Sequence, residues 1–361
     1  MESRKVQKVG YSTLAVSLPS KWVKDTDLKR GDNIFLIPEA DGSLKLLPNR
    51  LAKPEDSIEE YTCNADLCDE PRMMERIIVG SYILGRETFS LISSERVRGS
   101  HIEEIRQVIP KLIGLGIVEE TSDRVTIQCS VDPRKFNIDM LFRRLSIISL
   151  TIVKESVQAL VESNRSLAED AIKREDEADA MALLSMRLLV SAQRRREVAD
   201  EIGLKDPLHI LYFGLMLRYL ELIADYAEET ARRVIAILEK YKGKVSNSVV
   251  EKIDNLNDLA HDLVLKSVDS FFIGDIKIAN SLLEILTFVK LERERLMQEL
   301  PEVPHLRLIV GNIARIADNG AGIALIAINN ALEKKSKICS RNWSSSFKSK
   351  EAKPWTIDAD Q

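Results

Sequence analysis

Aromatic side chains are scarce in this sequence. Phenylalanine, tryptophan and tyrosine make up 5% of the 361 residues, whereas hydrophobic residues as a whole make up 45% and charged residues 30%. Apolar content of this kind suits the packing of helices better than an all-β sandwich. The length allows two or three domains of ordinary size. We therefore expect a multidomain, mainly α-helical protein.

Cysteine is also rare, and its spacing excludes two common classes of small domain. The chain has four cysteines, of which only Cys63 and Cys68 lie close together in the sequence. This C-x4-C spacing has no second ligand pair beside it, so neither a structural zinc site nor a disulfide framework is predicted. We expect reduced thiols in a cytoplasmic protein.

Long apolar runs and catalytic motifs are lacking as well. No run of about eighteen apolar residues is free of charge, and the first segment, MESRKVQKVG, has no apolar signal core. The chain contains no Gly-x-Ser-x-Gly, HExxH or P-loop motif and no Cys/His pair in a plausible context. We expect neither export nor membrane insertion, and no enzymatic activity.

The N-terminal residues predict a small β domain. The segment RKVQKVGYSTLAVSLPSKWV alternates apolar and polar residues on both sides of residues 10–12, as a β-hairpin does. A short helix is expected at 20–26, followed by a second hairpin formed by NIFLIP and SLKLLP. Residues 1–50 are too few to bury a sufficient core alone, so we expect this domain to pair with a second copy.

Positive charge is concentrated in this domain. Residues 1–50 hold nine Lys/Arg against six Asp/Glu, whereas residues 51–135 hold eleven against sixteen. A dimer doubles the basic side chains and provides a salt-sensitive footprint for DNA phosphates. Lysine supports backbone contacts more readily than base readout; alternatively, these are solvated residues of a purely dimerising domain. The expected DNA-binding residues are Arg4, Lys5, Lys8, Lys21, Lys24, Lys29 and Arg30.

The segments RKVQKVG, AVSLPSKWV, LKRGDNIFLIP and GSLKLLP, in this order, resemble the swapped-hairpin DNA-binding domain of AbrB-type regulators, the SpoVT/AbrB fold. The resemblance covers about residues 4–48. It implies a homodimer whose hairpins interlace and whose basic face binds double-stranded DNA. This chain has Tyr11 and Ser12 where several such proteins have an arginine after the first turn.

A polar linker containing Pro54 leads to a mixed segment. EYTCNA, TFSLISS and IVEETSDRVTIQCS predict three strands, and residues 70–84 and 100–113 predict helices. The order β-α-β-α-β predicts a small α+β module at residues 58–132. It has no phosphate-binding glycine spacing, and we expect a structural or small-effector role.

Long helices follow from residue 136 onward. A weak internal repeat aligns LELIADYAEETA at 220–231 with IARIADNGAGIA at 313–324. We expect two three-helix bundles, residues 136–243 and 246–335, and a disordered tail at 336–361. The predicted helices are 137–163, 165–199, 207–241, 246–271, 275–299 and 304–335.

One predicted helix carries a stripe of carboxylates. Glu221, Asp225 and Glu228 fall within about 60° of one another on a helix. The other side of this helix, formed by Leu220, Ile223, Ala227, Ala231 and Val234, is the expected buried seam. Like charges one turn apart repel, so a bound cation would explain the stripe, although ordinary solvation would also do so.

Two tandem three-helix units ending in such a helix resemble PhoU, the phosphate-signalling regulator. The resemblance implies E/D-x-x-x-D motifs that form acidic, metal-binding patches. Two such pairs on adjacent helices would form an oxygen-rich site, which suits a hard cation such as Mg2+, Mn2+ or iron. The second repeat has Ala314 in place of the glutamate, which puts a second patch in doubt. A separate acidic ladder at 254–262 with His261 offers ligands for a second site, or it is a set of ordinary surface residues. The implied metal ligands are Glu175, Asp179, Glu221, Asp225, Glu228 and Asp318.

Together the two resemblances imply a cytoplasmic, homodimeric transcription regulator of phosphate uptake, of the type found in archaea. The helical bundles would sense phosphate status or a partner, and the N-terminal heads would bind DNA. The alternative is an adaptor that docks on phosphate transporter components and uses its N-terminal domain only to dimerise.

Overall fold

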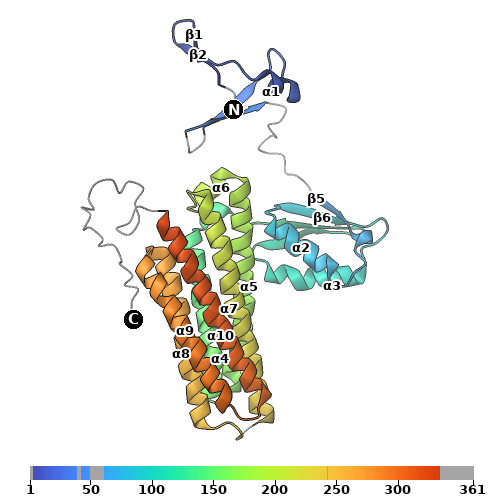
Figure 1. Ribbon diagram of the computed structural model, residues 1–361. Helices are drawn as coiled ribbons and strands as arrows, with labels where there is room; N and C mark the ends of the chain where they lie inside the picture. The colour runs from blue at the N-terminus through green and yellow to red at the C-terminus, as the bar shows by residue number, and fades with distance from the viewer. Residues whose placement is uncertain (1–2, 39–41, 49–60, 242, 334–361) are drawn as a thin grey trace, which may run out of the picture. The chain divides into compact units, whose positions relative to one another are not determined.

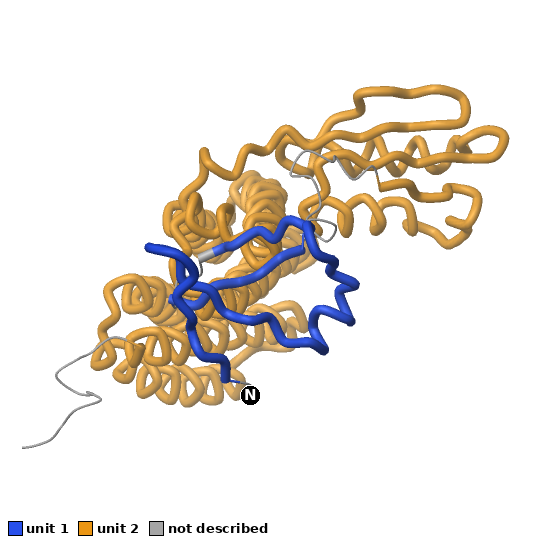
Figure 2. The backbone as a smooth tube through the Cα atoms, turned by 90° about the horizontal axis from the view of Figure 1, so that it is seen from above, with its two compact units in different colours: residues 1–59 blue, residues 60–361 orange. Residues whose placement is uncertain are grey.

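The computed structural model describes residues 3–38, 42–48, 61–241 and 243–333. They form two compact units, residues 1–59 and 60–361, which Figure 2 shows in different colours. The predicted disordered tail and the linker around Pro54 lie outside the described residues.

The N-terminal unit consists of two antiparallel hairpins and one short helix, as its alternating pattern predicts. Gly10 in the first turn has a φ of +68°, a conformation that glycine adopts readily. The first hairpin pairs Val9 with Thr13, and the second pairs Ile34 with Pro48. The elements are β1 (Gln7–Val9), β2 (Thr13–Ala15), α1 (Ser20–Asp25), β3 (Ile34–Pro38) and β4 (Leu44–Pro48).

This unit leaves nearly all of its apolar side chains unburied. Among its described residues only Pro48 is buried, and Tyr11 at the tip of the first hairpin is fully exposed. The exposed large apolar side chains are Val6, Val9, Tyr11, Leu14, Val16, Phe35, Leu36, Ile37 and Leu44. Isolated hairpins are marginally stable in water, so these side chains need a further surface to cover them.

The second unit begins with an α/β module. Its sheet has the strand order β5-β6-β8-β7, with β5 parallel to β6 and β8 antiparallel to both of its neighbours. The elements are β5 (Tyr61–Asn64), α2 (Met73–Ile83), β6 (Thr88–Ile92), α3 (Gly99–Val108), β7 (Leu115–Glu120) and β8 (Arg124–Cys129). Short 3-10 turns at Ala65–Leu67 and Ile109–Lys111 precede α2 and β7.

The prediction of one strand for IVEETSDRVTIQCS is wrong, because this segment forms β7 and β8. Between them the Thr121 hydroxyl donates to Asp123 at 2.9 Å, and the Thr121 N–H donates to the Arg124 carbonyl at 2.8 Å. These contacts are typical of a tight turn. The rest of the predicted strand and helix order is confirmed.

Helices α2 and α3 cover one face of the sheet (Figure 1). Ile78 and Tyr82 of α2 and Ile105 of α3 pack with Phe89 and Ile127 of the central strands, and all five are completely buried. The module therefore has a core of its own, separate from the core of the helices that follow.

Seven α-helices form the rest of the second unit as far as the structure describes it. They are α4 (Ile138–Val161), α5 (Arg165–Arg194), α6 (Arg196–Glu201), α7 (Pro207–Lys240), α8 (Asn247–Ile273), α9 (Ile276–Glu299) and α10 (Pro304–Leu332). Asn164 and Asp206 cap α5 and α7 through their side chains, and Gly274 ends α8 with a φ of +77°. The predicted helix 165–199 is interrupted, because Arg195 is extended between α5 and α6.

The long helices pack as two triples that share one core. Helices α4, α5 and α7 contact one another, as do α8, α9 and α10, and the triples meet where α7 packs on α10 and α4 on α8 (Figure 1). Phe213 of α7 packs edge-on against Phe142 of α4 at 4.7 Å and against Phe271 of α8 at 5.4 Å between ring centroids. The hydrophobic core therefore continues across the boundary predicted at 243–246.

Two arginines of α5 hold the α/β module against the bundle. Arg187 is only 4% exposed. Its guanidinium donates to the Tyr82 carbonyl at 2.6 Å and lies over the Tyr82 ring. Arg194 donates to the Leu84 carbonyl at 2.9 Å. Both arginines thus bring positive charge to carbonyls at the C-terminal end of α2, where the helix dipole is negative. The Tyr82 carbonyl also accepts a hydrogen bond from the Gly85 N–H at 3.0 Å.

Helix α7 is the one described helix that is long and apolar enough, by length and composition alone, to cross a membrane. In the structure it packs against α4, α5 and α10. Its apolar residues include Met216, Leu220 and Ile223, which are completely buried in the core. The central place of α7 in the bundle therefore accounts for part of its apolar character.

Candidate metal centre

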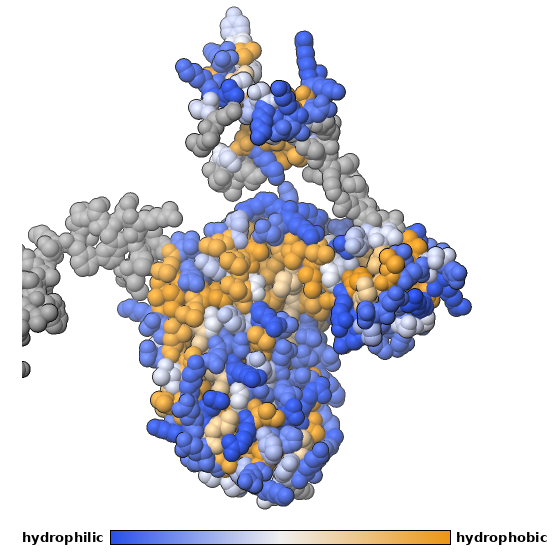
Figure 3. All heavy atoms as spheres, turned by 45° about the vertical axis from the view of Figure 1, so that its right-hand side comes forward, coloured by the Kyte–Doolittle hydropathy of each residue, from blue (hydrophilic) through white to orange (hydrophobic). Residues whose placement is uncertain are grey.

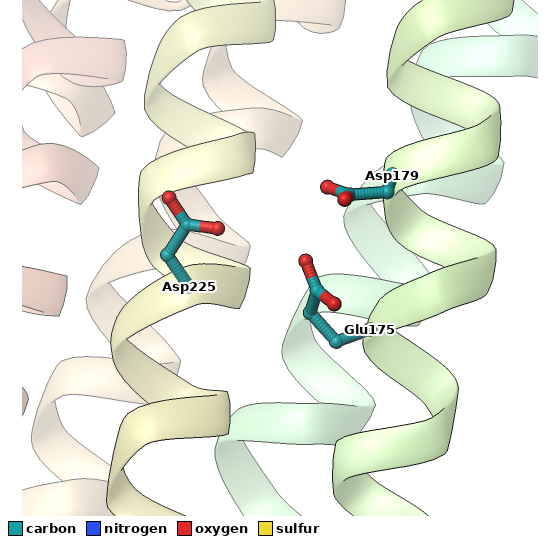
Figure 4. Close-up of side chains that lie close together, drawn as sticks. All are labelled: Glu175, Asp179 and Asp225. Atoms are coloured by element: carbon teal, nitrogen blue, oxygen red, sulfur yellow. The ribbon is translucent and has the colours of Figure 1, made fainter. Parts of the chain in front are cut away.

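Three carboxylates from two helices converge between α5 and α7. Glu175 and Asp179 lie one turn apart on α5, and Asp225 faces them from α7 (Figure 4). One oxygen atom from each of the three side chains lies within 4.8 Å of the other two. The group combines one residue of the predicted α7 stripe with the E-x-x-x-D pair of the neighbouring helix.

Helix α7 packs closely against α5 beside its carboxylates. All five residues of the predicted seam, from Leu220 to Val234, are completely buried, so that prediction is confirmed. Buried alanines occur on both helices, Ala178 on α5 and Ala224 and Ala227 on α7. Because the distance between packed helices depends on the side chains at their contact, alanines allow a close approach. The carboxylates beside the seam are thereby brought together.

The three carboxyl groups are difficult to ionise together. Burial and the neighbouring Asp179 raise the pKa of Glu175 to about 8. Burial and Glu221 raise the pKa of Asp225 to about 6, and burial also raises the pKa of Asp179. Nearby like charges and loss of water both disfavour the ionised form. A cation between the carboxylates would favour ionisation and remove this cost.

The donor set fits a hard divalent cation. Glu175, Asp179 and Asp225 form no ion pair with a Lys or Arg in the part of the chain that the structure describes. By contrast, Glu221 pairs with Arg218 at 3.1 Å and Glu228 pairs with Arg232 at 2.5 Å. Carboxylate oxygens suit Mg2+, Mn2+ or iron. Of the predicted ligands on α7, Asp225 alone is left without a partner of opposite charge.

This part of the chain is similar to known proteins. Residues 142–234, which run from α4 into α7 and include all three carboxylates, match the family model of the PhoU domain. The match agrees with the PhoU resemblance for these residues. The phosphate-specific transport system accessory protein PhoU homolog of Zymomonas mobilis is 26% identical over 195 residues, which make up 50% of this chain and 76% of that protein.

Two solved PhoU structures are similar to this chain. PhoU from Pseudomonas aeruginosa is 20% identical with a TM-score of 0.49, and the match covers 55% of this chain and 96% of that one. The phosphate transport system regulatory protein PhoU from Streptococcus pneumoniae is 15% identical with a TM-score of 0.44, and the match covers 55% and 94% of the two chains.

The described helices that follow residues 142–234 do not repeat this group of three carboxylates. Asp318 forms an ion pair with Lys290 of α9 at 2.9 Å, and Ala314, which stands in place of the glutamate, is buried. In the ladder at 254–262, Asp262 pairs with Lys266 at 3.3 Å. Within the described residues, Glu175, Asp179 and Asp225 are the one group of three or more potential ligands that the structure brings together.

The seven predicted DNA-binding residues all lie on the surface of the N-terminal unit. Lys8 is on β1, Lys21 and Lys24 are on α1, and Lys29 pairs with Asp27 at 3.9 Å. Exposure is a requirement for contacts with phosphate groups. Their role in DNA binding remains a prediction.

The thiols of the described residues are free, as predicted. Cys63, Cys68 and Cys129 form no disulfide, and Cys339 lies outside the described residues. Burial and the nearby Cys63 raise the pKa of Cys68 to about 11. The thiol of Cys68 therefore stays protonated at neutral pH and is a poor metal ligand or nucleophile.

A cavity of 620 Å³ was not predictable from any sequence pattern. It lies where the turn between α4 and α5, the end of α7 and the start of α8 meet. Leu160 and Ile237 form part of an apolar wall, and Glu251 and Asp254 add carboxylates. The walls of the cavity come from segments that are far apart in the sequence. Of these four residues, Asp254 alone belongs to a pattern visible in the sequence, the acidic ladder at 254–262.

Proposed function

We propose that this protein is a regulatory accessory protein of a phosphate transport system, acting in the cytoplasm and without enzymatic activity. The PhoU domain at residues 142–234 is the observation that carries the proposal. The relative from Zymomonas mobilis, whose name refers to phosphate-specific transport, supports it. The expected partners are components of a phosphate transporter.

The three carboxylates that converge between α5 and α7 are the proposed cation site. Glu175 and Asp179 would hold the cation from α5, and Asp225 would hold it from α7. When bound, a cation such as Mg2+, Mn2+ or iron supplies the positive charge that these side chains lack. Without it, ionised carboxylates face one another across the helix pair and repel. The preferred arrangement of α5 and α7 would then depend on cation binding.

Metal binding can be measured directly on purified protein. Asp225→Asn is expected to weaken Mn2+ binding in calorimetry about 10-fold or more, because one ligand loses its charge. Asp318→Asn is the matched control, since Asp318 pairs with Lys290 on other helices. Equal binding by the native chain and Asp225→Asn would contradict the proposed site.

The transport role requires a measurement in cells. Uptake of labelled phosphate is expected to change when the gene is deleted and to return with the native chain. A chain that lacks the helices from α4 to α10 should not restore it. Unchanged uptake after deletion, at both high and low phosphate, would contradict the accessory role.

The N-terminal unit favours a second function, DNA binding by a homodimer. Its apolar side chains are exposed, and pairing with a second copy would cover them. Its basic side chains, which include Lys8, Lys21 and Lys24, are exposed as well. A paired unit would present them twice, and repeated positive charge is what DNA binding requires. In this version the protein regulates transcription of phosphate-uptake genes.

A deletion of residues 1–59 distinguishes the two functions. Binding of the native chain to its own upstream DNA and to scrambled DNA is compared across a salt series, and sedimentation gives the oligomeric state. Preference for its own DNA that is lost on deletion would support the DNA-binding function. If deletion abolishes dimerisation and the native chain does not bind DNA, the hairpins only dimerise and the accessory role stands alone.

A further inference from the structure

One end of the bundle carries an apolar surface that no described part of its unit covers. Figure 3 shows a hydrophobic band across the upper part of the bundle. Among the exposed apolar side chains of α7 and α10 are Leu211, which is 56% exposed, and Leu325, which is 52% exposed. We call the apolar residues along this seam the α7–α10 face: Leu208, Leu211, Leu215, Leu325, Ile328 and Leu332.

The two helices run side by side along this face. Gly322 lies so near Tyr219 that an added Cβ would come within 2.5 Å of the Tyr219 ring. Further along, Tyr212 of α7 lies near two carboxylates, that of Glu333 after the end of α10 and that of Asp206 before the start of α7. Burial raises the pKa of Tyr212, and these two carboxylates raise it further. The end of α10 is therefore close to the start of α7, and the six apolar side chains lie between these two levels.

We propose that the C-terminal segment, residues 334–361, folds back onto the α7–α10 face and covers it. The described chain ends at Glu333, directly beside the face. An extended chain spans at most about 3.3–3.6 Å per residue, so Trp343 can reach any point of a face that is only about 12 Å long on each helix. Trp355 can do the same.

The composition of the segment fits this surface. It holds two of the three tryptophans of the chain, Trp343 and Trp355, together with Phe347. Buried aromatic side chains are the usual anchors of short segments on apolar surfaces. The segment also carries seven Lys/Arg against three Asp/Glu in a chain of net charge −4. Asp206 and Glu333 place negative charge at the edge of the face.

A second copy of the bundle fits less well. Stable dimer interfaces bury about 800 Å² on each partner, and the α7–α10 face extends over only about two turns of each helix. Exposed apolar patches of a few hundred Å² are generally covered or functional. A short segment of the same chain has the right size and is always present at high local concentration.

Tryptophan fluorescence of the full chain tests the proposal. In a Trp22→Phe variant the two tail tryptophans report alone; they are expected to emit at shorter wavelength and to be quenched less by acrylamide than in a free peptide of residues 334–361. Leu325→Ser should remove these differences. Leu291→Ser, at a position on α9 that is 49% exposed, should leave them unchanged. The difference spectrum between the native chain and Trp343→Phe/Trp355→Phe gives the same readout without altering Trp22.

A chain truncated after Glu333 provides the second measurement. It is expected to bind more apolar dye than the full chain, and Leu325→Ser in the truncated chain should reduce the excess. Tail tryptophans that emit and quench as they do in the free peptide would overturn the proposal. Truncation without extra dye binding, combined with a dimer that Leu325→Ser abolishes, would also overturn it and assign the face to a second copy.

Discussion

Replacing Gly320 with alanine tests how closely α8 and α10 approach each other. A Cβ added at Gly320 would lie 2.7 Å from Leu263 Cδ2, 2.8 Å from Val264 Cγ2 and 3.2 Å from Val264 Cα. Leu263 and Val264 are completely buried, so they have little room to move. The added methyl group would therefore push two helices of the second triple apart.

Two opposing effects set the size of the change. Alanine is about 1 kcal/mol more favourable than glycine inside a helix, whereas an extra carbon in a packed core costs about 1–3 kcal/mol. One of the close atoms belongs to the backbone of α8, which places the cost in the upper part of that range. We expect Gly320→Ala to lower the free energy of unfolding by about 1–2 kcal/mol in total.

Gly311 provides a matched control in the same helix. No atom lies within 4 Å of a Cβ added there, so Gly311→Ala should raise the free energy of unfolding by up to about 1 kcal/mol. Urea unfolding followed by circular dichroism at the helix band measures both variants. Midpoints that move in opposite directions agree with the reasoning. A stabilised Gly320→Ala variant would refute the close contact between α8 and α10.

Three further predictions concern the other contacts. Arg187→Ala should lower the free energy of unfolding by about 1.5–3 kcal/mol, because it leaves the Tyr82 carbonyl without a charged donor; Arg194→Ala, at an exposed position, should cost less in the same urea assay. Folding raises the pKa of Glu175 from 4.5 to about 8. The stability that its protonated carboxyl group contributes is therefore fully present below pH 4.5 and is lost as the pH rises through about 8. Chelator-treated protein should lose stability over that interval, and Glu175→Gln should lose less; equal pH profiles would contradict this. Lys8→Ala, which removes two charges from a dimer, should reduce the salt slope of DNA binding by about 2; an unchanged slope would place Lys8 outside the DNA contact.

Much of the helical architecture is predictable from local signals. Asn164, Asp206 and Gly274 mark helix ends because their side chains or backbone satisfy groups that the helix itself leaves open. Such signals depend only on neighbouring residues, so they can be read without knowing the fold. The break at Arg195 carries no such signal, and the predicted helix 165–199 accordingly continues across it into α6.

Local signals do not predict which carboxylates come together between α5 and α7. A stripe on one helix predicts which side chains share a direction, but it does not say which of them a second helix will approach. The structure selects Asp225, and it leaves Glu221 and Glu228 with Arg218 and Arg232. Those arginines stand three residues before Glu221 and four residues after Glu228, so their pairing could have been anticipated from the i,i+3 and i,i+4 rule. The meeting of α5 with α7 could not.

Because the two helix triples share one continuous core, the sequence repeat does not coincide with the unit that folds stably. In sequence, the repeat ends near residue 243, and each copy supplies three helices. Phe213, however, packs on both Phe142 and Phe271, so separating the copies would strip apolar surface from both. A fragment cut at the repeat boundary should be prone to aggregate, whereas the six helices should unfold as one cooperative body. Helices that have no matching carboxylates would thus still determine how firmly the carboxylates of the first triple are held.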